Sequence, residues 1–463
     1  MDLERLVAAL GAVEVVGRAP VEVRDLAYDA RAVTPGALFF CVPGARADGH
    51  DFAPDAVERG AAALVVERPL ELAVPQVVVR DARASMAVAA DEFFGRPTQE
   101  LAVVGVTGTS GKTTTAFLLY AILAAAGRRP GLLGTVEARV GGERRGVVRT
   151  TPEAIDLQRT FREMLDAGDR SCAMEASSHA SQLHRLDRVR FAALVFTNLS
   201  QDHLDFHGDM ESYFEAKRRL FVTGSPPAAV NVGDEYGRRL AAELPDALTF
   251  GFAPDAAIGP AALEGVELKL RGRFNVENAL AALAAARLLG IDDAAIARGL
   301  ESVRGVPGRF ESVEEGQPFT VVVDYAHKPD ALENVLRAAR ELARGRVICV
   351  VGAGGDRDRG KRPLMGRLAS ELADVAIVTS DNPRSEDPQA IIDEIVAGAV
   401  GEVEVEPDRA AAIARAVELA REGDVVLIAG KGAEQGQQLA DRTIPFDDRE
   451  AAREALRTLG ACA

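Results

Sequence analysis

Short apolar runs alternate with segments of helical periodicity along the last third of the chain. Apolar runs bounded by turn residues are typical of buried strands, and apolar positions three and four residues apart are typical of helices. Strands that alternate with helices form a parallel, doubly wound sheet. The pattern predicts strands over 320–324, 346–352, 375–379, 402–405 and 424–429, and helices over 329–343, 362–372, 388–399 and 409–421.

The earlier part of the chain follows a similar but less regular pattern. Strands are expected over 37–42, 62–66, 101–106, 172–175 and 193–197, and helices from residue 112 to about Gly127 and over 276–289. Turn-forming residues break the pattern near 95–97 and 305–308. These breaks predict three domains: 1–97, a small α/β domain; 98–306, a central domain; and 307–463, a C-terminal domain with the parallel sheet.

Composition narrows the class of protein. The chain has 463 residues and a formal net charge of −16, which disfavours nucleic-acid or membrane partners. Four separated cysteines, Cys41, Cys172, Cys349 and Cys462, form no CxxC pair, as is typical of reduced thiols. The N-terminal residues do not resemble a signal peptide, and no apolar run of about 18 residues occurs. We expect a cytoplasmic protein, and we take it to be a monomer.

A glycine-rich loop gives the strongest local signal. It follows the strand predicted over 101–106 and opens a helix, so its backbone N–H groups can bind phosphate oxygens. Lys112 would reach the β- and γ-phosphates of a nucleotide, and the Thr113 hydroxyl would hold Mg²⁺. The early glycine is one residue too soon for the strict P-loop spacing. The predicted nucleotide-binding residues are Gly108, Thr109, Ser110, Gly111, Lys112, Thr113 and Thr114.

Two further segments end predicted strands and carry acids and histidines. Ligands bind outside the carboxyl ends of strands in open α/β sheets, so Glu175 and His203 are candidate Mg²⁺ ligands. Mg²⁺ prefers oxygen, which leaves His203 the weaker candidate. A zinc site at His203 and His207 would lack a third ligand. A Ser/His/Asp hydrolase built from residues 178, 179 and 202 would lack a GxSxG turn and would not explain the phosphate loop.

Taken together, these segments resemble the Mur ligase family, and the resemblance spans essentially the whole chain. It implies a UDP-substrate-binding N-terminal domain, a central P-loop ATPase with a mostly parallel sheet, and a C-terminal Rossmann-like domain that binds an amino acid. Within the family, the chain is most similar to ligases that add meso-diaminopimelate to UDP-N-acetylmuramoyl-L-alanyl-D-glutamate in peptidoglycan synthesis. The supporting strings are GVTGTSGKTTT, RTTPEAIDLQ, MEASSHASQLHR, FTNLSQDHLDFHGDMESYFEAK, GRFNVENALAA, GVPGRFE, VDYAHKPDAL, GAGGDRDRGKRPLMG, SDNPRSEDP and AGKGAEQGQ.

The resemblance also implies roles for individual residues. ATP and Mg²⁺ would be required, and Lys112, His203 and a carbamylated Lys217 would serve catalysis. The implied Mg²⁺ ligands are Thr113, Glu175, His203 and Lys217; the implied ATP contacts beyond the loop are Asn278, Arg309 and Asp324. Contacts to the UDP-linked dipeptide are implied for Thr150, Thr151, Ser177, Arg185 and Ala30, where Ala30 stands in place of the family's serine.

A predicted turn after a C-terminal strand would select the incoming amino acid. The Arg384 guanidinium can bind a carboxylate through two hydrogen bonds, which fits the second amino-acid head of meso-diaminopimelate. L-Lysine has only an ammonium there, which Arg384 would repel. The resemblance implies the same role for Arg357, Asp381, Asn382, Pro383, Gly430 and Glu434. Ala433 replaces the histidine of the usual GKGHE, and one residue is inserted before the DNPR string.

Three other functions share parts of this pattern. A sibling ligase that adds L-lysine is disfavoured by Arg384. A ligase similar to folylpolyglutamate synthase would lack the N-terminal domain. A non-enzymatic ATP-binding regulator would not need both Lys112 and Lys217.

Overall fold

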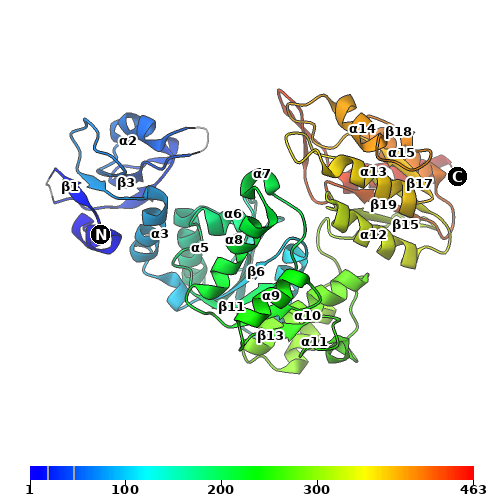
Figure 1. Cartoon of the computed structure of the whole chain (residues 1–463), viewed down its shortest axis with the longest axis horizontal. Coiled ribbons are helices and arrows are strands. Elements are labelled where there is room, and N and C mark those ends of the chain that lie inside the picture. Colours follow the sequence, from blue (N-terminus) through cyan, green and yellow to red (C-terminus); the bar gives the residue numbers. More distant parts are fainter. Residues whose placement is uncertain (18–19, 45–46, 463) are drawn as a thin grey trace. The chain divides into compact units, whose positions relative to one another are not determined.

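The computed structural model describes residues 1–17, 20–44 and 47–462. The chain divides into two compact units, which are described separately. The first unit comprises Met1–Thr107, Gly127–Val195 and Glu215–Ala228. The second unit comprises Gly108–Ala126, Phe196–Phe214 and Ala229–Ala463. Figure 1 labels the helices and strands of both units.

A five-stranded sheet opens the first unit, with the strand order β1-β5-β4-β3-β2. All neighbours pair in parallel except β1 and β5. Successive side chains of a strand point to opposite faces, so Phe39 and Phe40 enter two different cores. The strands are β1 (Glu14–Val16), β2 (Asp25–Ala27), β3 (Ala37–Phe40), β4 (Ala63–Val66) and β5 (Gln76–Val78), and the helices are α1 (Leu3–Leu10), α2 (Ala53–Glu58) and α3 (Ala82–Phe93).

An eight-stranded sheet follows in the order β13-β12-β11-β6-β10-β7-β8-β9. Strands β6 and β10 pair in parallel with Val106 opposite Glu175, so Glu175 lies beside the carboxyl end of β6. Strands β7, β8 and β9 form antiparallel pairs. The strands are β6 (Ala102–Thr107), β7 (Pro130–Leu133), β8 (Ala138–Val140), β9 (Glu143–Arg145), β10 (Ser171–Glu175), β11 (Phe191–Phe196), β12 (Ala228–Asn231) and β13 (Leu248–Phe250).

Helices connect these strands. Helix α4 (Lys112–Ala125) begins at the end of the glycine-rich loop, and α8 (Met210–Val222) carries Lys217. The other helices of this part of the chain are α5 (Ala154–Asp166), α6 (Ser178–Gln182), α7 (Leu204–His207), α9 (Glu235–Glu243), α10 (Arg273–Leu288) and α11 (Asp293–Ser302).

The C-terminal sheet lies wholly in the second unit and has the order β14-β15-β19-β16-β17-β18. Strand β14 is antiparallel to β15, and the remaining pairs are parallel. The strands are β14 (Glu311–Val313), β15 (Thr320–Asp324), β16 (Val347–Val351), β17 (Val375–Val378), β18 (Glu404–Val405) and β19 (Val425–Ala429). Two short strands, β20 (Gly436–Gln438) and β21 (Thr443–Pro445), form a separate antiparallel pair.

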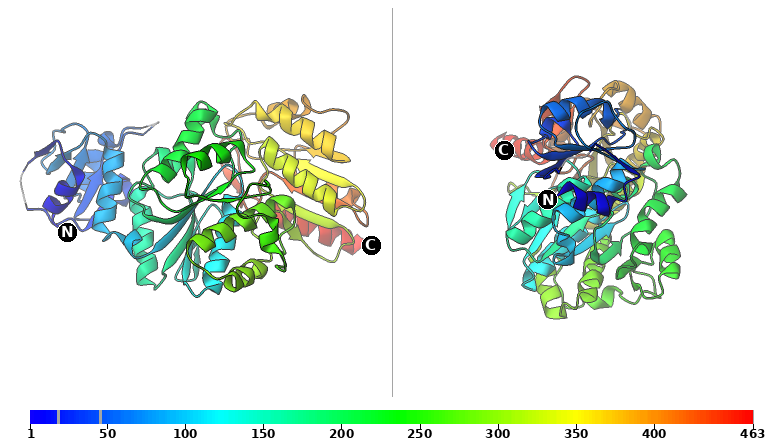
Figure 2. Two further views of the ribbon diagram at one scale, coloured as in Figure 1. Left: turned by 60° about the horizontal axis from the view of Figure 1, so that its bottom comes forward. Right: turned by 90° about the vertical axis from the view of Figure 1, so that its left-hand side faces the viewer.

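Helices cover both faces of the C-terminal sheet. Val351 packs with α12 (Pro329–Leu342), α13 (Lys361–Leu372) and α14 (Pro388–Val396), whereas Val350 packs with α15 (Arg409–Leu419) and α16 (Asp448–Cys462). Figure 2 shows the yellow and red helices on opposite sides of this sheet. The doubly wound arrangement expected from the sequence is therefore confirmed, as is an α/β chain with three sheet-containing domains. The boundaries near 97 and 306 stay predictions.

Some expected elements have different ends. The helix predicted over 388–399 ends at Val396, and Gly398 then packs so closely that a Cβ there would lie 2.0 Å from the Pro363 carbonyl oxygen. The β7–β8–β9 segment was not expected from the sequence. Its strands are three or four residues long, and the charged strand Glu143–Arg145 is exposed. The sequence therefore has no apolar pattern from which this segment could be predicted.

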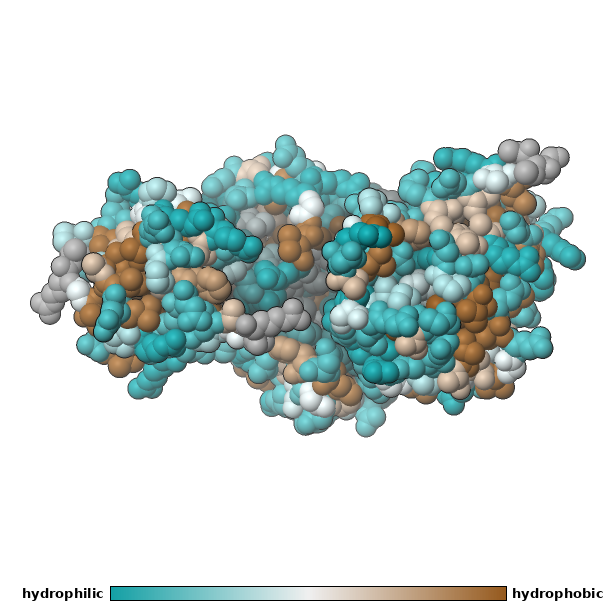
Figure 3. Space-filling model, turned by 90° about the horizontal axis from the view of Figure 1, so that it is seen from above, coloured by the Kyte–Doolittle hydropathy of each residue, from teal (hydrophilic) through white to brown (hydrophobic). Residues whose placement is uncertain are grey.

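The hydrophilic character of the surface agrees with the charged composition of the chain. On the face shown in Figure 3, hydrophilic residues form most of the surface and hydrophobic residues gather in separate patches. Among the described residues, no helix has the length and apolar character that crossing a membrane requires. Among the described residues, Cys41, Cys172 and Cys349 are buried and form no disulfide.

Candidate active site

The glycine-rich loop of the second unit is built by close contact with the segment that follows β11. Asn198 accepts hydrogen bonds from two loop N–H groups: its carbonyl oxygen from Thr109 at 2.9 Å, and its Oδ1 from Ser110 at 2.9 Å. Gly108 has a φ of 145°, and a Cβ there would lie 1.9 Å from Thr197 Oγ1. Only glycine fits this position, which explains why the loop needs it.

Lys112 folds back over the loop. Its ammonium donates to the carbonyl oxygens of Gly108 and Thr109, both at 2.9 Å. A lysine held at the mouth of a loop that opens a helix is suited to meet a phosphate group.

Asn278 supports the loop from α10. A Cβ on Gly111 would lie 2.3 Å from Asn278 Oδ1, and Thr115 Oγ1 lies 3.4 Å from the same atom. Asn278 was expected to contact adenosine. The structure places its side-chain oxygen against the loop, with its amide donating to Asn275 at 3.1 Å.

Thr113 and Thr114 are buried in the first turn of α4. Arg309 donates from Nη2 to Thr113 Oγ1 at 3.0 Å, and its guanidinium lies 4.5 Å from the centre of the Tyr325 ring. Two predicted nucleotide-binding residues that are 196 positions apart in sequence are therefore in direct contact.

Asp324 ends β15 and is buried beside this group. Its carboxylate accepts a hydrogen bond from the Phe310 N–H at 2.7 Å. Burial raises the pKa of Asp324 to about 6, although the charge of Arg309 acts in the opposite direction. The carboxylate is therefore a costly buried charge, as is common at functional sites.

Glu175 is buried in the first unit at the end of β10. Thr135 donates to it twice, from its backbone N–H at 2.7 Å and from its hydroxyl at 3.1 Å. Gly134 leaves room for the carboxylate, because a Cβ there would lie 2.6 Å from Glu175 Oε1. These protein contacts fix the orientation of the Glu175 carboxylate, a predicted metal ligand.

The predicted dipeptide contacts gather around Glu175. Thr150 Oγ1 lies 3.0 Å from Thr135 Oγ1, and Thr151 donates from its hydroxyl to the Glu175 carbonyl oxygen at 2.8 Å. Thr151 Oγ1 also accepts a hydrogen bond from the Ser177 N–H at 3.2 Å. Arg185 donates to the Thr151 carbonyl oxygen at 3.2 Å.

Arg185 has the character of a ligand-binding cation. It pairs with Glu153 at 2.8 Å, and burial lowers its pKa from the usual arginine value. Its Nε is buried and has no hydrogen-bond partner in the part of the chain that the structure describes. A buried donor of this kind is unusual unless a ligand or water completes it.

Two further predicted residues, Lys217 and Ala30, belong to the first unit. Lys217, on α8, is a buried lysine with 1% of its surface exposed. Ala30 begins a short 3-10 helix that Asp29 caps by accepting a hydrogen bond from the Arg31 N–H at 3.0 Å. Ala30 is itself buried, so the methyl group packs in the domain core.

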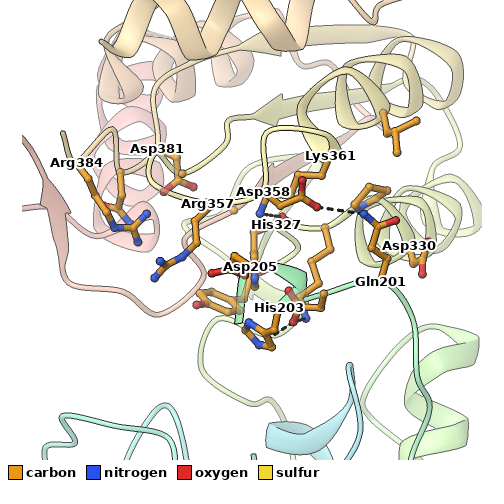
Figure 4. Close-up of a pocket in the computed structure, with 18 of the residues that line it drawn as sticks. Gln201, His203, Asp205, His327, Asp330, Arg357, Asp358, Lys361, Asp381 and Arg384 are labelled. Carbon is orange, nitrogen blue, oxygen red and sulfur yellow. Dashed lines mark hydrogen bonds and ion pairs between the residues drawn. The ribbon is translucent and has the colours of Figure 1, made fainter. Parts of the chain in front are cut away.

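A cavity of about 220 Å³ in the second unit gathers the predicted amino-acid selector with His203 (Figure 4). Arg357, Asp381 and Arg384 project into it from the C-terminal domain. His203 and Asp205 approach it from the segment after β11. Of the predicted selector residues, Arg357, Asp381, Asn382, Arg384, Gly430 and Glu434 line the cavity, and Pro383 does not.

Arg384 is held in a left-handed conformation, with a φ of 52°. It donates from Nη1 to the Gly355 carbonyl oxygen at 2.6 Å and from Nε to Gln438 Oε1 at 2.9 Å. Burial and the neighbouring charge of Arg357 lower the pKa of Arg384 from its usual value. The half-buried Arg384 and the exposed Arg357 both line the cavity, and two like charges at one site favour an anionic ligand.

His203 is also left-handed, with a φ of 53°. Its Nε2 lies 2.9 Å from Asp202 Oδ2, and Lys328 Nζ lies 2.6 Å from the same oxygen. Burial alone would raise the pKa of Asp202, but Lys328 and His203 hold it well below its usual range. Burial lowers the pKa of His203, so its imidazole is a neutral, potential ligand near pH 7.

Sequence reasoning missed several residues that shape these sites. Asp202 was considered only as part of a hydrolase, yet it binds Lys328 and His203. Thr135 and Asn198 position Glu175 and the glycine-rich loop. A polar residue directly after a predicted strand was the available signal, and it marks Asn198 but neither Asp202 nor Thr135.

No cluster of three or more histidine, cysteine or acidic side chains suited to a metal occurs among the described residues. This disfavours the zinc site considered at His203 and His207. The Thr113 hydroxyl in the second unit and the Glu175 carboxylate in the first unit are both buried.

Comparisons with known proteins match nearly the whole chain. Three family models match it: "Mur ligase family, catalytic domain" over residues 22–94, "Mur ligase middle domain" over 106–286, and "Mur ligase, glutamate ligase domain" over 308–432.

Curated relatives carry one activity in their names. A UDP-N-acetylmuramoyl-L-alanyl-D-glutamate–2,6-diaminopimelate ligase of Solibacter usitatus is 49% identical, covering 96% of this chain and 95% of the relative. The enzyme of the same name from Geobacillus thermodenitrificans is 46% identical over 99% of both chains. A solved structure of a ligase of that name is 31% identical, has a TM-score of 0.68 and is covered to 99%, as is this chain.

Proposed function

This chain belongs to the Mur ligase family, and from that premise we propose that it joins meso-diaminopimelate to UDP-N-acetylmuramoyl-L-alanyl-D-glutamate at the expense of ATP. The observation that carries the proposal is the selector cavity, in which Arg384 and Arg357 lie beside Asp381 and Glu434. Full-length relatives at 46–49% identity are named for the same reaction.

The charges of the cavity support diaminopimelate over a simpler amino acid. The far end of diaminopimelate carries a carboxylate and an ammonium. Arg384 offers a planar set of donors for the carboxylate, and Glu434 offers an acceptor for the ammonium. L-Lysine would leave the half-buried Arg384 guanidinium without its anion, and a hydrogen bond to a charged group contributes about 1.5–3 kcal/mol. Ala433, where the family has histidine, does not line the cavity.

The reaction consists of two transfers. The γ-carboxylate oxygen of the D-glutamyl residue attacks the γ-phosphorus of ATP, the bond to the bridging oxygen breaks, and ADP leaves. The diaminopimelate amine then attacks the acyl carbon, loses a proton, and inorganic phosphate leaves as the amide forms. Lys112 and the loop N–H groups would stabilise charge on the transferred phosphoryl group.

The remaining residues of the nucleotide site are assigned in the same way. Asn278, Arg309 and Asp324 would contact ATP, and Asn278 would also hold the loop in shape. Thr150, Thr151, Ser177 and Arg185 would contact the dipeptide substrate, and the Ala30 segment the uridine.

Magnesium is the metal that these side chains would suit. Thr113, Glu175, His203 and a carbamylated Lys217 are its candidate ligands, and carbamylation would turn the buried cation of Lys217 into an anion. Bound Mg²⁺ would offset the negative charge of the phosphates and of the acceptor carboxylate.

Phosphate release tests the proposal. The protein is mixed with ATP and the UDP-linked dipeptide, and meso-diaminopimelate, L-lysine or no amino acid is added. We expect release to depend on the dipeptide and to be fastest with meso-diaminopimelate. Faster release with L-lysine would refute the proposed specificity, and no release with any amino acid would refute the ligase activity.

A further inference from the structure

A buried lysine, Lys431, lies directly behind the selector cavity. Lys431 follows β19, has none of its side-chain surface exposed, and does not line the cavity. Its ammonium donates to Asn382 Oδ1 at 2.8 Å and to Glu434 Oε2 at 3.2 Å, and lies 3.9 Å from Asp381 Oδ1. All three of these partners do line the cavity.

The sheet topology explains why such a link is needed. Asn382 follows β17, whereas Lys431 follows β19, and β16 lies between these two strands. No ladder hydrogen bond joins the ends of strands that are not neighbours. The chain after β17 crosses the end of β16 at Gly352, where a Cβ would lie 2.6 Å from the Thr379 carbonyl oxygen. Side-chain hydrogen bonds from Lys431 therefore add to the backbone hydrogen bond from the Arg384 N–H to the Gln438 carbonyl oxygen in joining the two halves of the cavity wall.

Lys431 also determines how the Asn382 amide is oriented. An ammonium has donors only, so the oxygen of Asn382 must face Lys431. That oxygen also accepts from the Gln438 N–H at 2.9 Å, and the amide nitrogen then donates to Glu434 Oε2 at 2.8 Å. Within the described residues, both hydrogen bonds to the Glu434 carboxylate go to Oε2, which leaves Oε1 available to an ammonium.

A second buried cation holds the backbone of the same two strand ends. Arg409 donates to the carbonyl oxygens of Ser380 at 3.4 Å and Ala429 at 3.0 Å, and pairs with Asp448 at 2.7 Å. Arg409 and Asp448 are both fully buried. Because Arg409 ties the backbone, loss of Lys431 should disturb the side chains of the cavity wall more than the fold.

We propose that Lys431 is a positioning residue for the incoming amino acid, which fixes Asn382 and Glu434 across the end of β16. This inference rests on the proposed function, because it assumes that these two side chains meet the amino acid. Lys431 itself touches no substrate. Its contribution is to keep the cavity wall preorganised, so that binding need not order it.

Kinetics of Lys431→Met test the inference. We expect the apparent KM for meso-diaminopimelate to rise about tenfold or more, since a hydrogen bond to a charged group is lost. The apparent KM values for ATP and the UDP-linked dipeptide should change less than about threefold. Lys431→Gln, which retains a donor, should recover part of the loss and serves as the test variant if Lys431→Met does not fold.

Two comparisons separate positioning from a general structural effect. Arg346→Met removes the partner of Asp424 at the opposite, amino end of the same sheet, where the two pair at 2.8 Å, and should leave the amino-acid KM unchanged. In a Glu434→Gln background, Lys431→Met should add much less to the KM than it does alone.

The outcomes are distinct. An unmodified protein that consumes no amino acid would overturn the proposed function and this inference with it. Normal turnover by the unmodified protein, together with an unchanged KM in Lys431→Met or strictly additive effects with Glu434→Gln, would overturn the inference alone.

Discussion

Arg309 donates a hydrogen bond to Thr113 across 3.0 Å, and its guanidinium also lies against the ring of Tyr325. Thr113 belongs to the first turn after the glycine-rich loop, and Tyr325 lines the selector cavity. One side chain therefore contacts both the first turn of α4 and a residue that lines the cavity.

Loss of this guanidinium should weaken nucleotide binding. We expect Arg309→Ala to raise the apparent KM for ATP about tenfold or more, because a charged hydrogen bond near the phosphates is lost. Steady-state kinetics with varied ATP measures the effect. Arg304→Ala, an exposed arginine nearby in sequence, is the matched control. Equal effects of the two substitutions would contradict a phosphate contact.

Lys217 should be needed for turnover and replaceable by an added anion. We expect Lys217→Ala to lower kcat by about 100-fold or more, since an electrostatic contribution to the transition state is lost. Short carboxylic acids should restore part of the rate by standing in for the carbamate. Arg218→Ala, beside it on α8, should remain active. The carbamate hypothesis would be refuted if Lys217→Ala kept the normal kcat, or if added carboxylic acids left its kcat unchanged.

Arg384 should control affinity for the amino acid. We expect Arg384→Ala to raise the apparent KM for meso-diaminopimelate about 10- to 100-fold, and that for ATP far less. Arg359→Ala removes an exposed arginine that pairs with Glu394 and serves as the control. If the KM values for both substrates rose equally, Arg384 would not be the selector.

Asp324 should make stability depend on pH. Its pKa is about 6 in the folded protein against 3.8 ordinarily, so the folded state holds the proton more tightly than the unfolded chain. This contribution to stability is complete below about pH 4 and is lost as pH rises through about 6. The loss is about 3 kcal/mol.

Thermal unfolding measures the pH effect. Between about pH 4 and pH 7, the Tm of the unmodified protein should fall relative to that of Asp324→Asn, which cannot titrate. Two Tm curves that stay parallel across this range would show that Asp324 keeps an ordinary pKa.

The sequence was sufficient for the features that depend on local pattern. The alternation after residue 306 located five of the six strands of the C-terminal sheet. Four of the five are largely buried apolar runs between turns, whereas β18 is short and exposed. The run that contains Lys112 was likewise recognisable, because a strand, glycines and a helix start must be adjacent in sequence to form such a loop.

Contacts between distant segments could not be derived in this way. Lys328 meets Asp202 and Lys431 meets Asn382 only because strand order brings the segments together. Neither contact could be predicted from the residue types alone. Asn278 illustrates the same limit: the fold brings its side chain against Gly111, which the sequence did not indicate, and its expected contact with adenosine stays a prediction.

Oxygen transfer tests the central claim most directly. The UDP-linked dipeptide, labelled with ¹⁸O in its D-glutamyl γ-carboxylate, is incubated with ATP and an equal mixture of meso-diaminopimelate and L-lysine, with Lys112→Ala as the inactive control. The proposed mechanism predicts a diaminopimelate-containing product and inorganic phosphate that carries one ¹⁸O atom from the carboxylate. Unlabelled phosphate, or a product that contains mainly L-lysine, would contradict it.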